Sequence, residues 1–234
     1  MSNLRIKPIV AFLPCRKGSE RVPRKNVKKF ADLKNGLIEL KLKQLIKCKE
    51  IKEIILSTND QEIIKYATSL NIKKIKIDQR ADELSSSETT TDELIIYAGN
   101  IIKNAHILWT HVTSPFIDNK SYSLIVRKYY EKLSEEYDSL MTVTPIQSFI
   151  WNEKNPVNYN QLDEKWPRTQ TLEPLFEVNS GVFISSDANY RKFNDRIGLT
   201  PFMYKLDKTQ SMDIDWPEDF IMAEQMYIHS QKLS

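Results

Sequence analysis

A basic segment at residues 14–30 holds seven Lys and Arg residues but a single acidic one, Glu20. It directly follows the apolar run 9–13, which is typical of a buried strand, and ligands of open α/β sheets bind beyond the carboxyl ends of the strands. Because Gly18 is its only glycine, it lacks the G-x-x-x-x-G-K-S/T pattern of a Walker loop, so Arg and Lys side chains must supply much of the phosphate binding. The segment predicts a polyphosphate site, and a solvated basic surface loop is the alternative.

A second group that could do chemistry is the pair of carboxylates at Asp213 and Asp215. Side chains two apart in an extended segment point to the same side. Two convergent carboxylates bind Mg²⁺ well, with waters and phosphate oxygens completing the octahedron. The alternative is structural: Asp215 would cap the last helix, with Pro217 in its first turn and Glu218 completing a capping box.

Alternating strand and helix patterns surround these two segments. Apolar runs predict strands at 9–13, 53–57, 74–77, 105–110, 139–143, 182–185 and 202–206. Periodicity and capping residues predict helices at 37–48, at 59–70 with Asn59 as the cap, after the Thr90–Glu93 capping box, at 119–133 and after Asp215. This order predicts one α/β domain of residues 1–234, in which helices cover a mostly parallel, Rossmann-like sheet in three layers.

Length and composition exclude several classes of protein. The 234 residues carry 34 basic and 31 acidic side chains, with no basic stripe interleaved with aromatics, so no nucleic-acid partner is expected. No apolar run reaches the length of a membrane span, and residues 1–15 lack the apolar core of a signal peptide. Cys15 and Cys48 are expected to be free thiols in a reducing compartment, so we predict a cytoplasmic protein without a membrane partner.

Residues 16–26 read R-x-G-S-x-R-x-P-x-K-N, which closely resembles the first motif of the acylneuraminate cytidylyltransferase family. These enzymes make CMP-activated sialic acids and related nonulosonic acids from CTP. The resemblance implies a fold of the nucleotide-diphospho-sugar transferase type in which this segment binds CTP. The residues that it assigns to the nucleotide here are Arg16, Ser19, Arg21, Lys25 and Asn26.

The D-I-D metal motif of the same family matches residues 213–215 without a gap. The resemblance therefore implies that Asp213 and Asp215 bind Mg²⁺, or Mn²⁺ in its place. It also implies catalytic roles for Arg16, Lys25 and Asp215. The two cations would stabilise the α-phosphate and the departing pyrophosphate, and the carboxylate would hold the metal that orients the nucleophile.

A further stretch of similarity lies at residues 80–91. The family's R-P-x-E-L-A-x-(S/D) stretch is matched at Arg80 and at 83–85, and Thr91 falls at the position of a serine that faces the nucleotide. The resemblance implies that Arg80, Ser85 and Thr91 contact the nucleotide. The alternative is a structural loop that only leads into the next helix.

Two more motifs bear on the acceptor. The family's Q-P-T-S-P-L stretch is matched at Thr113 and Ser114, with His111 in place of the glutamine, and its P-R-x-Q stretch is matched at 167–170. Its aromatic-R-x-N-G stretch aligns at Asn179. The residues that the resemblance assigns to the acceptor are His111, Thr113, Ser114, Arg168, Gln170, Glu177 and Asn179.

Glu177 is the largest departure from the family pattern, because it replaces an acceptor-site arginine, and Ser180 is an insertion beside it. A carboxylate at this point repels an acidic sugar unless an amino group pairs with it. Either another cation, for which Arg168 is the candidate, takes the sugar carboxylate, or the sugar brings an amino or amidine group towards Glu177. We therefore expect poor activity with N-acetylneuraminate and better activity with an amino-substituted or otherwise different acceptor.

Residues 145–178 form a long segment without clear periodicity that contains Trp151 and Trp166. Such a stretch is unusual inside a compact domain. The family has a protruding dimerisation arm at this place, so the resemblance implies an arm here and a homodimer in which the tryptophans find a partner surface.

Together these motifs predict an enzyme that transfers CMP from CTP to a 2-keto-3-deoxy sugar acid, such as a sialic, legionaminic or pseudaminic acid, and releases pyrophosphate. Surface polysaccharide biosynthesis is the expected setting. One alternative is a cytidylyltransferase for another acceptor, such as 3-deoxy-octulosonate or a phosphonate. The other is a non-catalytic nucleotide-binding relative.

Overall fold

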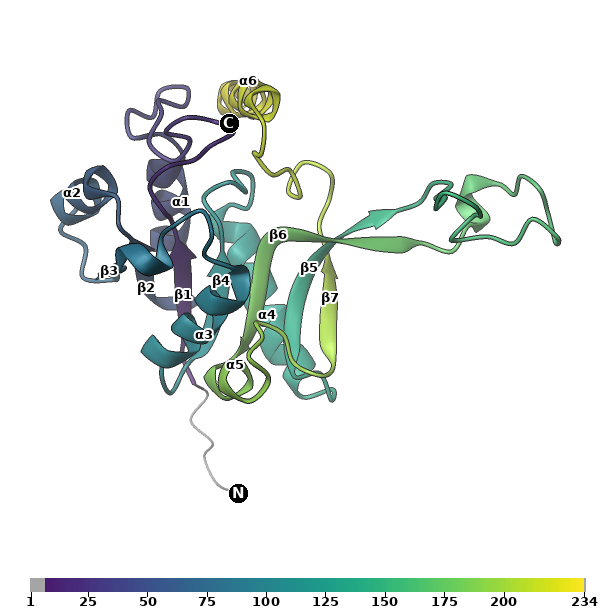
Figure 1. The fold of residues 1–234 in the computed structure, drawn as a ribbon, viewed down its shortest axis with the longest axis horizontal. Helices are drawn as coiled ribbons and strands as arrows, with labels where there is room; N and C mark the ends of the chain where they lie inside the picture. The colour runs from purple at the N-terminus through teal and green to yellow at the C-terminus, as the bar shows by residue number, and fades with distance from the viewer. Residues whose placement is uncertain (1–6, 234) are drawn as a thin grey trace.

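A single seven-stranded sheet organises the chain, which is described by a computed structural model over residues 7–233 (Figure 1). Residues 1–6, which begin the stretch assessed for a signal peptide, lie outside the described residues, as does residue 234. The strand order is β3-β2-β1-β4-β6-β5-β7. β6 runs antiparallel to both of its neighbours and the other pairs are parallel, so the predicted mostly parallel sheet is confirmed.

The elements alternate as the sequence predicts. The strands are β1 (Ile9–Pro14), β2 (Ile51–Thr58), β3 (Ile75–Gln79), β4 (His106–Thr110), β5 (Ser139–Ile146), β6 (Leu175–Ser186) and β7 (Pro201–Lys205). The α-helices are α1 (Gly36–Lys47), α2 (Gln61–Ser69), α3 (Thr91–Ile101), α4 (Asn119–Leu133), α5 (Asp187–Phe193) and α6 (Pro217–Leu233). Short 3₁₀ turns, η1 (Asp82–Leu84) and η2 (Thr169–Thr171), lie in the connections. Within residues 7–233, no helix is long and apolar enough to span a membrane.

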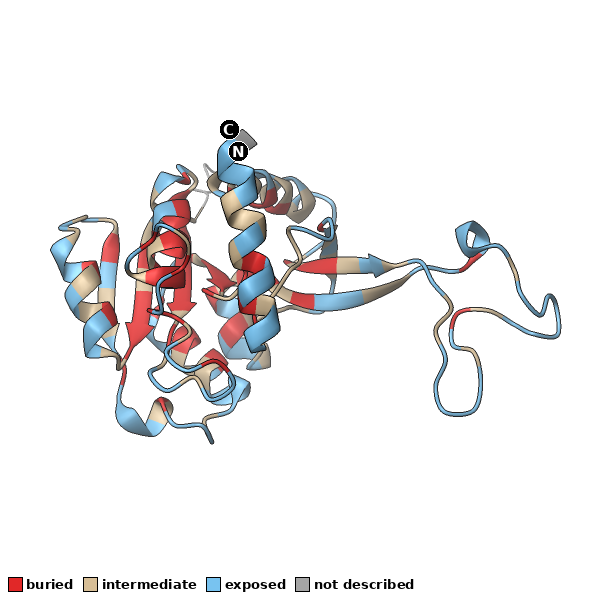
Figure 2. Cartoon of the chain, turned by 90° about the horizontal axis from the view of Figure 1, so that it is seen from above, coloured by how far each residue is buried: buried red, intermediate tan, exposed pale blue. Residues whose placement is uncertain are grey.

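Helices cover both faces of the sheet, which makes the predicted three layers. One buried cluster joins the sheet to α1, α2, α4 and α6, and a second joins it to α3 and α5. Successive side chains of β1 pack into opposite clusters: Ala11 and Leu13 lie in the first, and Val10 and Phe12 lie in the second. A strand buried on both faces needs a continuous apolar run, which is why this one was visible in the sequence. Figure 2 shows the buried residues concentrated along the sheet.

Helix starts agree with the sequence at one place and differ at another. Thr90 and Glu93 form the predicted capping box of α3. The prediction that Asn59 caps α2 is wrong, because the carboxylate of Asp60 accepts the N–H of Glu62. Asp60 directly precedes the first helical residue, the position from which a side chain reaches the free N–H groups. Asn59 instead accepts a hydrogen bond from the backbone of Lys17.

The segment predicted to be irregular begins and ends as regular structure. β5 continues to Ile146 and β6 begins at Leu175, and together they form an antiparallel ribbon that projects from the body and carries residues 147–174 at its far end (Figure 1). At the base of the ribbon the single residue Thr142 lies opposite residues 179–182, a bulge in β6. Helix α5, which the sequence patterns did not predict, follows β6 directly.

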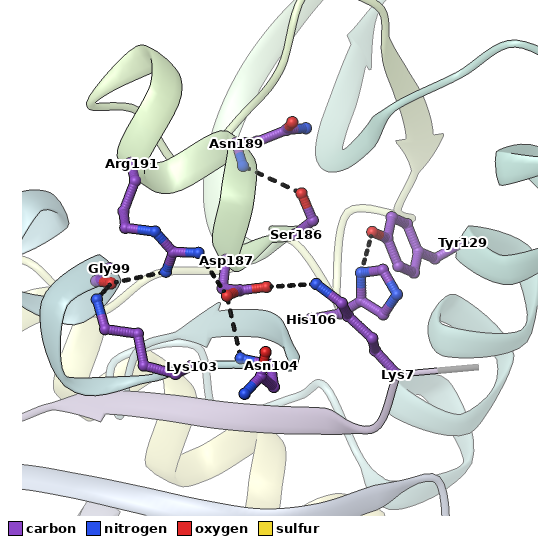
Figure 3. A network of polar contacts seen from close by, with 10 residues as sticks. All are labelled: Lys7, Gly99, Lys103, Asn104, His106, Tyr129, Ser186, Asp187, Asn189 and Arg191. Atoms are coloured by element: carbon purple, nitrogen blue, oxygen red, sulfur yellow. Dashed lines mark hydrogen bonds and ion pairs between the residues drawn. The ribbon is translucent and has the colours of Figure 1, made fainter. Parts of the chain in front are cut away.

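A polar network lies at the amino ends of β1 and β4, the edge of the sheet opposite the basic segment (Figure 3). The buried carboxylate of Asp187 accepts hydrogen bonds from Lys7 Nζ at 2.9 Å, from the backbone of Asn104 at 3.0 Å and from Arg191 Nη2 at 2.7 Å. His106 Nδ1 lies 2.8 Å from the hydroxyl of Tyr129. These contacts join α5 and α4 to the sheet, so the network is structural.

Acid is expected to destabilise the fold through His106. Burial lowers the pKa of His106 from 6.5 to about 4, with Lys7 adding to the shift and Asp187 opposing it. The unfolded chain binds this proton more tightly than the folded chain does. The contribution of neutral His106 to the free energy of unfolding is therefore complete above pH 6.5 and is lost as the pH falls to 4, and the loss reaches about 3 kcal/mol. Urea unfolding at pH 7 and pH 4 should show a smaller difference for His106→Gln than for the wild type.

The matched control for this prediction is His229→Gln, because His229 is exposed on α6. It should lose as much stability on acidification as the wild type. An equally large loss in His106→Gln would contradict the assignment.

Candidate active site

Local hydrogen bonds shape the basic segment into a fixed loop after β1. The backbone N–H of Cys15 donates to Ser57 O on β2, which extends the strand pairing by one residue. The side-chain amide of Asn26 donates to Arg16 O at 3.2 Å, and Asn26 O accepts from Ile38 N on α1. Asn26 thus ties the start of the loop to its end and to the first helix, which fixes where the side chains of Arg16 and Lys25 begin.

This loop and the loop after β4 line a pocket of about 300 Å³. It lies at the carboxyl ends of β1 and β4, where open α/β sheets bind ligands. The pocket brings together many of the residues predicted from the sequence. They are Arg16, Ser19, Arg21, Lys25, Asn26, His111 and Thr113.

The D-I-D segment is fastened to this pocket from the other side. Ile214 is fully buried, its N–H donates to Thr113 O at 2.9 Å, and its carbonyl accepts from Lys25 Nζ at 2.6 Å. The carboxylate of Asp215 lies 3.1 Å from Arg21 Nη2 and 3.7 Å from Lys25 Nζ. Two segments that lie almost 190 residues apart in the chain therefore form one site.

The structural alternative for Asp215 is wrong. The carboxylate of Asp219 accepts the backbone N–H groups of Asp215 and Trp216, at 3.0 and 2.8 Å, so Asp219 supplies the hydrogen bonds at the start of α6. The carboxylate of Asp215 is left for the cations of the pocket.

Lys25 is the most enclosed cation of the pocket, with 12% of its side chain exposed. Burial lowers the pKa of Lys25 below its ordinary value, and the carboxylates of Asp215 and Asp213 oppose that shift. A partly desolvated ammonium beside two carboxylates is a strong point charge for a ligand phosphate, because water screens it little.

The donors present fit a metal only in part. Asp213 and Asp215 flank the buried Ile214 and remain partly exposed, as metal-binding carboxylates must. In the part of the chain that the structure describes, no group of three or more His, Cys, Asp or Glu side chains could hold a metal ion by itself. Mg²⁺ commonly takes one or two carboxylates and completes its shell with waters and substrate phosphates. The pair therefore suits a metal that arrives with a polyphosphate.

Arg80 directly follows β3 and Ser85 follows η1, and neither of them lines the pocket. Both are buried, and the Nε of Arg80 donates to Ser85 Oγ at 3.0 Å. Burial raises the pKa of the Cys15 thiol, which lines the pocket, and Arg80 lies close enough to oppose that rise. Nη1 of Arg80 is buried without a partner among residues 7–233, so a donor is left for an acceptor atom from outside the chain. Thr91, the first residue of α3, is exposed and does not line the pocket.

His111 and Ser114 have defined partners. His111 Nε2 accepts from Trp109 Nε1 at 2.9 Å, which leaves the ring proton on Nδ1 as a donor. Burial lowers the pKa of His111 to about 3, and the nearby cations Arg196, Lys41 and Lys25 add to the shift, so the ring is neutral. Ser114 is buried and its hydroxyl donates to Ser180 O at 3.4 Å.

The remaining acceptor candidates lie on β6 and the projecting ribbon. Asn179 is engaged at the bulge: its side chain accepts from Thr142 Oγ1 at 2.6 Å and donates to Thr144 Oγ1 at 3.0 Å. Glu177 is exposed on the ribbon, paired with Thr144. Arg168 and Gln170 are exposed beyond the ribbon, in the part that projects away from the pocket. None of these four lines the pocket of this chain.

Lys41 on α1 was missed by the sequence analysis, although it lies directly beneath the site. It is fully buried and its Nζ donates to Ser114 O at 2.7 Å. The signal was present, because Lys41 interrupts the apolar stripe formed by Ile38, Leu42 and Leu45. A helix is predicted from the apolar residues of its stripe, and that pattern gives no weight to a charged residue within it.

Comparison with known proteins identifies the family of the chain. A sequence profile described as cytidylyltransferase matches residues 10–232. The chain is 27% identical to an N-acylneuraminate cytidylyltransferase of Streptococcus agalactiae, over 92% of this chain and 52% of that protein. It is 26% identical to a pseudaminic acid cytidylyltransferase of Campylobacter jejuni, over 93% of this chain and 95% of that protein. The chain thus spans about half the length of the first relative and nearly all of the second.

Two solved structures share the fold at low sequence identity. A CMP:2-keto-3-deoxy-manno-octonic acid synthetase in complex with CTP superposes with a TM-score of 0.67 at 12% identity, over 95% of this chain and 99% of that one. A 4-diphosphocytidyl-2C-methyl-D-erythritol synthase of Anaerococcus prevotii superposes with a TM-score of 0.65 at 16% identity, over 94% and 96%. These likenesses confirm the predicted nucleotide-diphospho-sugar transferase fold.

Proposed function

The chain belongs to the cytidylyltransferase family, and we propose that it transfers CMP from CTP to a 2-keto-3-deoxy sugar acid and releases pyrophosphate. The observation that carries the proposal is that Arg16, Arg21 and Lys25 line one pocket and that the carboxylate of Asp215 lies against two of these cations. Cations in such a pocket suit a triphosphate, and the adjacent carboxylates suit the metal that accompanies it. Both sequence relatives named above are cytidylyltransferases of acidic nine-carbon sugars, which supports this class of acceptor.

In the proposed reaction the anomeric hydroxyl of the acceptor attacks the α-phosphorus of CTP in line. A new O–P bond forms while the bond between the α-phosphorus and the pyrophosphate oxygen breaks, and the proton of the attacking hydroxyl passes to a base, for which an aspartate and a metal-bound hydroxide are the two candidates. Negative charge grows on the α-phosphate oxygens and on the leaving pyrophosphate, and Arg16 and Lys25 stabilise it. When bound, Mg²⁺ or Mn²⁺ at Asp213 and Asp215 supplies further charge stabilisation as a Lewis acid.

On the acceptor side, His111 and Thr113 line the pocket next to the nucleotide loop. The Nδ1–H of His111 is free to donate to a ribose or sugar hydroxyl, because Trp109 occupies its other ring nitrogen. Arg168 and Gln170 lie in residues 147–174, which the ribbon carries away from the body, and neither lines this pocket, so we infer that an acceptor in the pocket meets them from another copy of the chain. We therefore propose a homodimer through the ribbon, whose exposed Trp151 and Trp166 would be covered by the partner.

The test is a pyrophosphate-release assay with Mg²⁺ and a panel of acidic sugars: N-acetylneuraminate, legionaminic acid, pseudaminic acid and 3-deoxy-octulosonate, with a phosphonate as the outlier. We expect turnover with CTP and a nine-carbon acid, and far slower turnover with ATP or GTP. A pocket whose buried groups pair with a pyrimidine edge leaves them unpaired with other bases.

The same panel separates the alternatives. Turnover only with 3-deoxy-octulosonate or the phosphonate would keep the cytidylyl transfer and change the acceptor. CTP binding without any turnover would favour a non-catalytic relative, and equal turnover with ATP would contradict the proposal. Among the nine-carbon acids, slow turnover of N-acetylneuraminate is expected if Glu177 faces the acceptor.

A further inference from the structure

Lys41 is a buried lysine without a carboxylate partner. It is fully buried on α1, and no ion pair within residues 7–233 includes it. Its Nζ donates to Ser114 O at 2.7 Å and to the hydroxyl of Tyr122 at 2.8 Å. Burying an ammonium group is costly, and hydrogen bonds of this kind offset the cost. An apolar side chain would pack α1 without this cost, so helix packing does not explain a lysine at this position.

The hydrogen bonds beyond Lys41 run in one direction. Thr110 Oγ1 donates its single proton to Gly181 O at 2.7 Å. The hydroxyl of Tyr122, 2.7 Å away, must then donate to Thr110 Oγ1, which leaves Tyr122 to accept from Lys41. Lys41 is thus the first donor of a buried chain that links α1 through α4 and β4 to the bulge in β6.

Two segments of the acceptor side and the D-I-D segment meet on this chain of hydrogen bonds. The carbonyl of Ser114 binds Lys41 directly, and the hydroxyl of the same residue donates to Ser180 O in the β6 bulge. The carbonyl of the preceding residue, Thr113, accepts from the backbone of Ile214 between the two aspartates. One turn after Lys41, Gln44 donates to Pro115 O at 2.6 Å. Hydrogen bonds that begin at α1 therefore fix the positions of three segments relative to one another: the loop after β4, the β6 bulge and the D-I-D segment.

We propose that Lys41 is a positioning residue that holds the acceptor side of the site without touching the substrate. The consequence for the reaction rests on the function proposed above, whereas the effect on the three segments does not. The electrostatics agree with this placement: burial lowers the pKa of Lys41 to about 7 and the carboxylate of Asp213 opposes that shift, so the two groups sense each other.

The test compares Lys41→Met with Lys43→Met on the same helix. Methionine keeps the length of the side chain but removes the donor, and Lys43 is an exposed lysine paired with Glu39. Hydrogen exchange followed by mass spectrometry should be about tenfold faster in segments 112–116, 179–183 and 212–216 of Lys41→Met, because each loses part of its support. Lys43→Met should exchange like the wild type.

Steady-state kinetics provide the second measurement. In Lys41→Met the KM for the acceptor should rise about 10- to 100-fold, since the acceptor side is misplaced while the nucleotide loop is not. The affinity for CTP without acceptor should fall less than the KM for the acceptor rises, because Lys41 reaches the nucleotide-binding groups only indirectly, through the hydrogen bond between Thr113 and Ile214.

The inference would be overturned if all three segments of Lys41→Met exchanged hydrogen at the wild-type rate. It would also be overturned if exchange became faster by the same factor over the whole chain. If that variant does not fold, Tyr122→Phe decides, because it keeps the ring and Lys41 but removes the hydroxyl that links Lys41 to Thr110. Faster exchange confined to 179–183 is then expected, and no local change would refute the role. If the wild type turns over no acceptor, the proposed function fails, while the exchange pattern still decides the role of Lys41.

Discussion

Asp215→Asn is expected to lower kcat by about 100- to 1,000-fold with saturating CTP, acceptor and Mg²⁺. The asparagine keeps the shape of the side chain but removes the charge that lies 3.1 Å from Arg21 and 3.7 Å from Lys25. It would hold the metal weakly and would no longer orient the two cations. Initial rates of pyrophosphate release over a Mg²⁺ titration measure the effect.

The fold of this variant should remain intact. The side chains of Arg21 and Asp215 are each close to half exposed, and an ion pair of that kind contributes at most about 1 kcal/mol. Asp219→Asn is the matched control, because it removes a carboxylate from the same helix start while asparagine still accepts the capping hydrogen bonds. Its turnover should be near that of the wild type. Near-normal turnover of Asp215→Asn at saturating Mg²⁺ would remove the metal site from the proposal.

Lys25→Met is expected to reduce kcat/KM for CTP by about 100- to 1,000-fold, the cost of losing one aligned charge from a site of developing negative charge. Lys25 Nζ is held by Ile214 O at 2.6 Å, so it is aimed before the ligand arrives. The charge is also shielded from water on most sides, which strengthens its interaction with phosphate. Stopped-flow or steady-state assays over a CTP titration report the change.

Lys29→Met is the control for Lys25→Met, because Lys29 lies in the same basic segment but is exposed and outside the pocket. It should leave kcat/KM close to the wild-type value. If both variants lose activity equally, the basic segment acts through its overall charge, and the assignment of a specific role to Lys25 fails.

Much of this protein can be predicted from short stretches of sequence. The buried strand β1, the Thr90–Glu93 capping box and the alternation of strands and helices depend on neighbours within a few residues, so their patterns are visible in the chain itself. The two motifs around Lys25 and Asp215 are equally compact, and each carries its chemistry in residue type and spacing.

Other features depend on contacts between distant segments, which local patterns do not encode. Asn59 and Asp60 are both good caps, and only the entry angle of the chain into α2 selected Asp60. The ribbon of β5 and β6 is stabilised by pairing across the arm, so it is regular where the sequence has no period. The same pairing leaves Glu177 exposed and places Asn179 at the bulge, where its side chain hydrogen-bonds Thr142 and Thr144.

The candidate active site depends both on local sequence motifs and on contacts between distant segments. The sequence determined that phosphate-binding cations follow one strand and that two carboxylates precede the last helix. Only the strand order, with β4 beside β1, brought the loops after these two strands to one edge, and the Thr113–Ile214 hydrogen bond then closed the D-I-D segment onto them. Lys41 shows the same division: its residue type is visible in an apolar stripe, but its partners come from α4 and the loop after β4, which only the packed fold places around it.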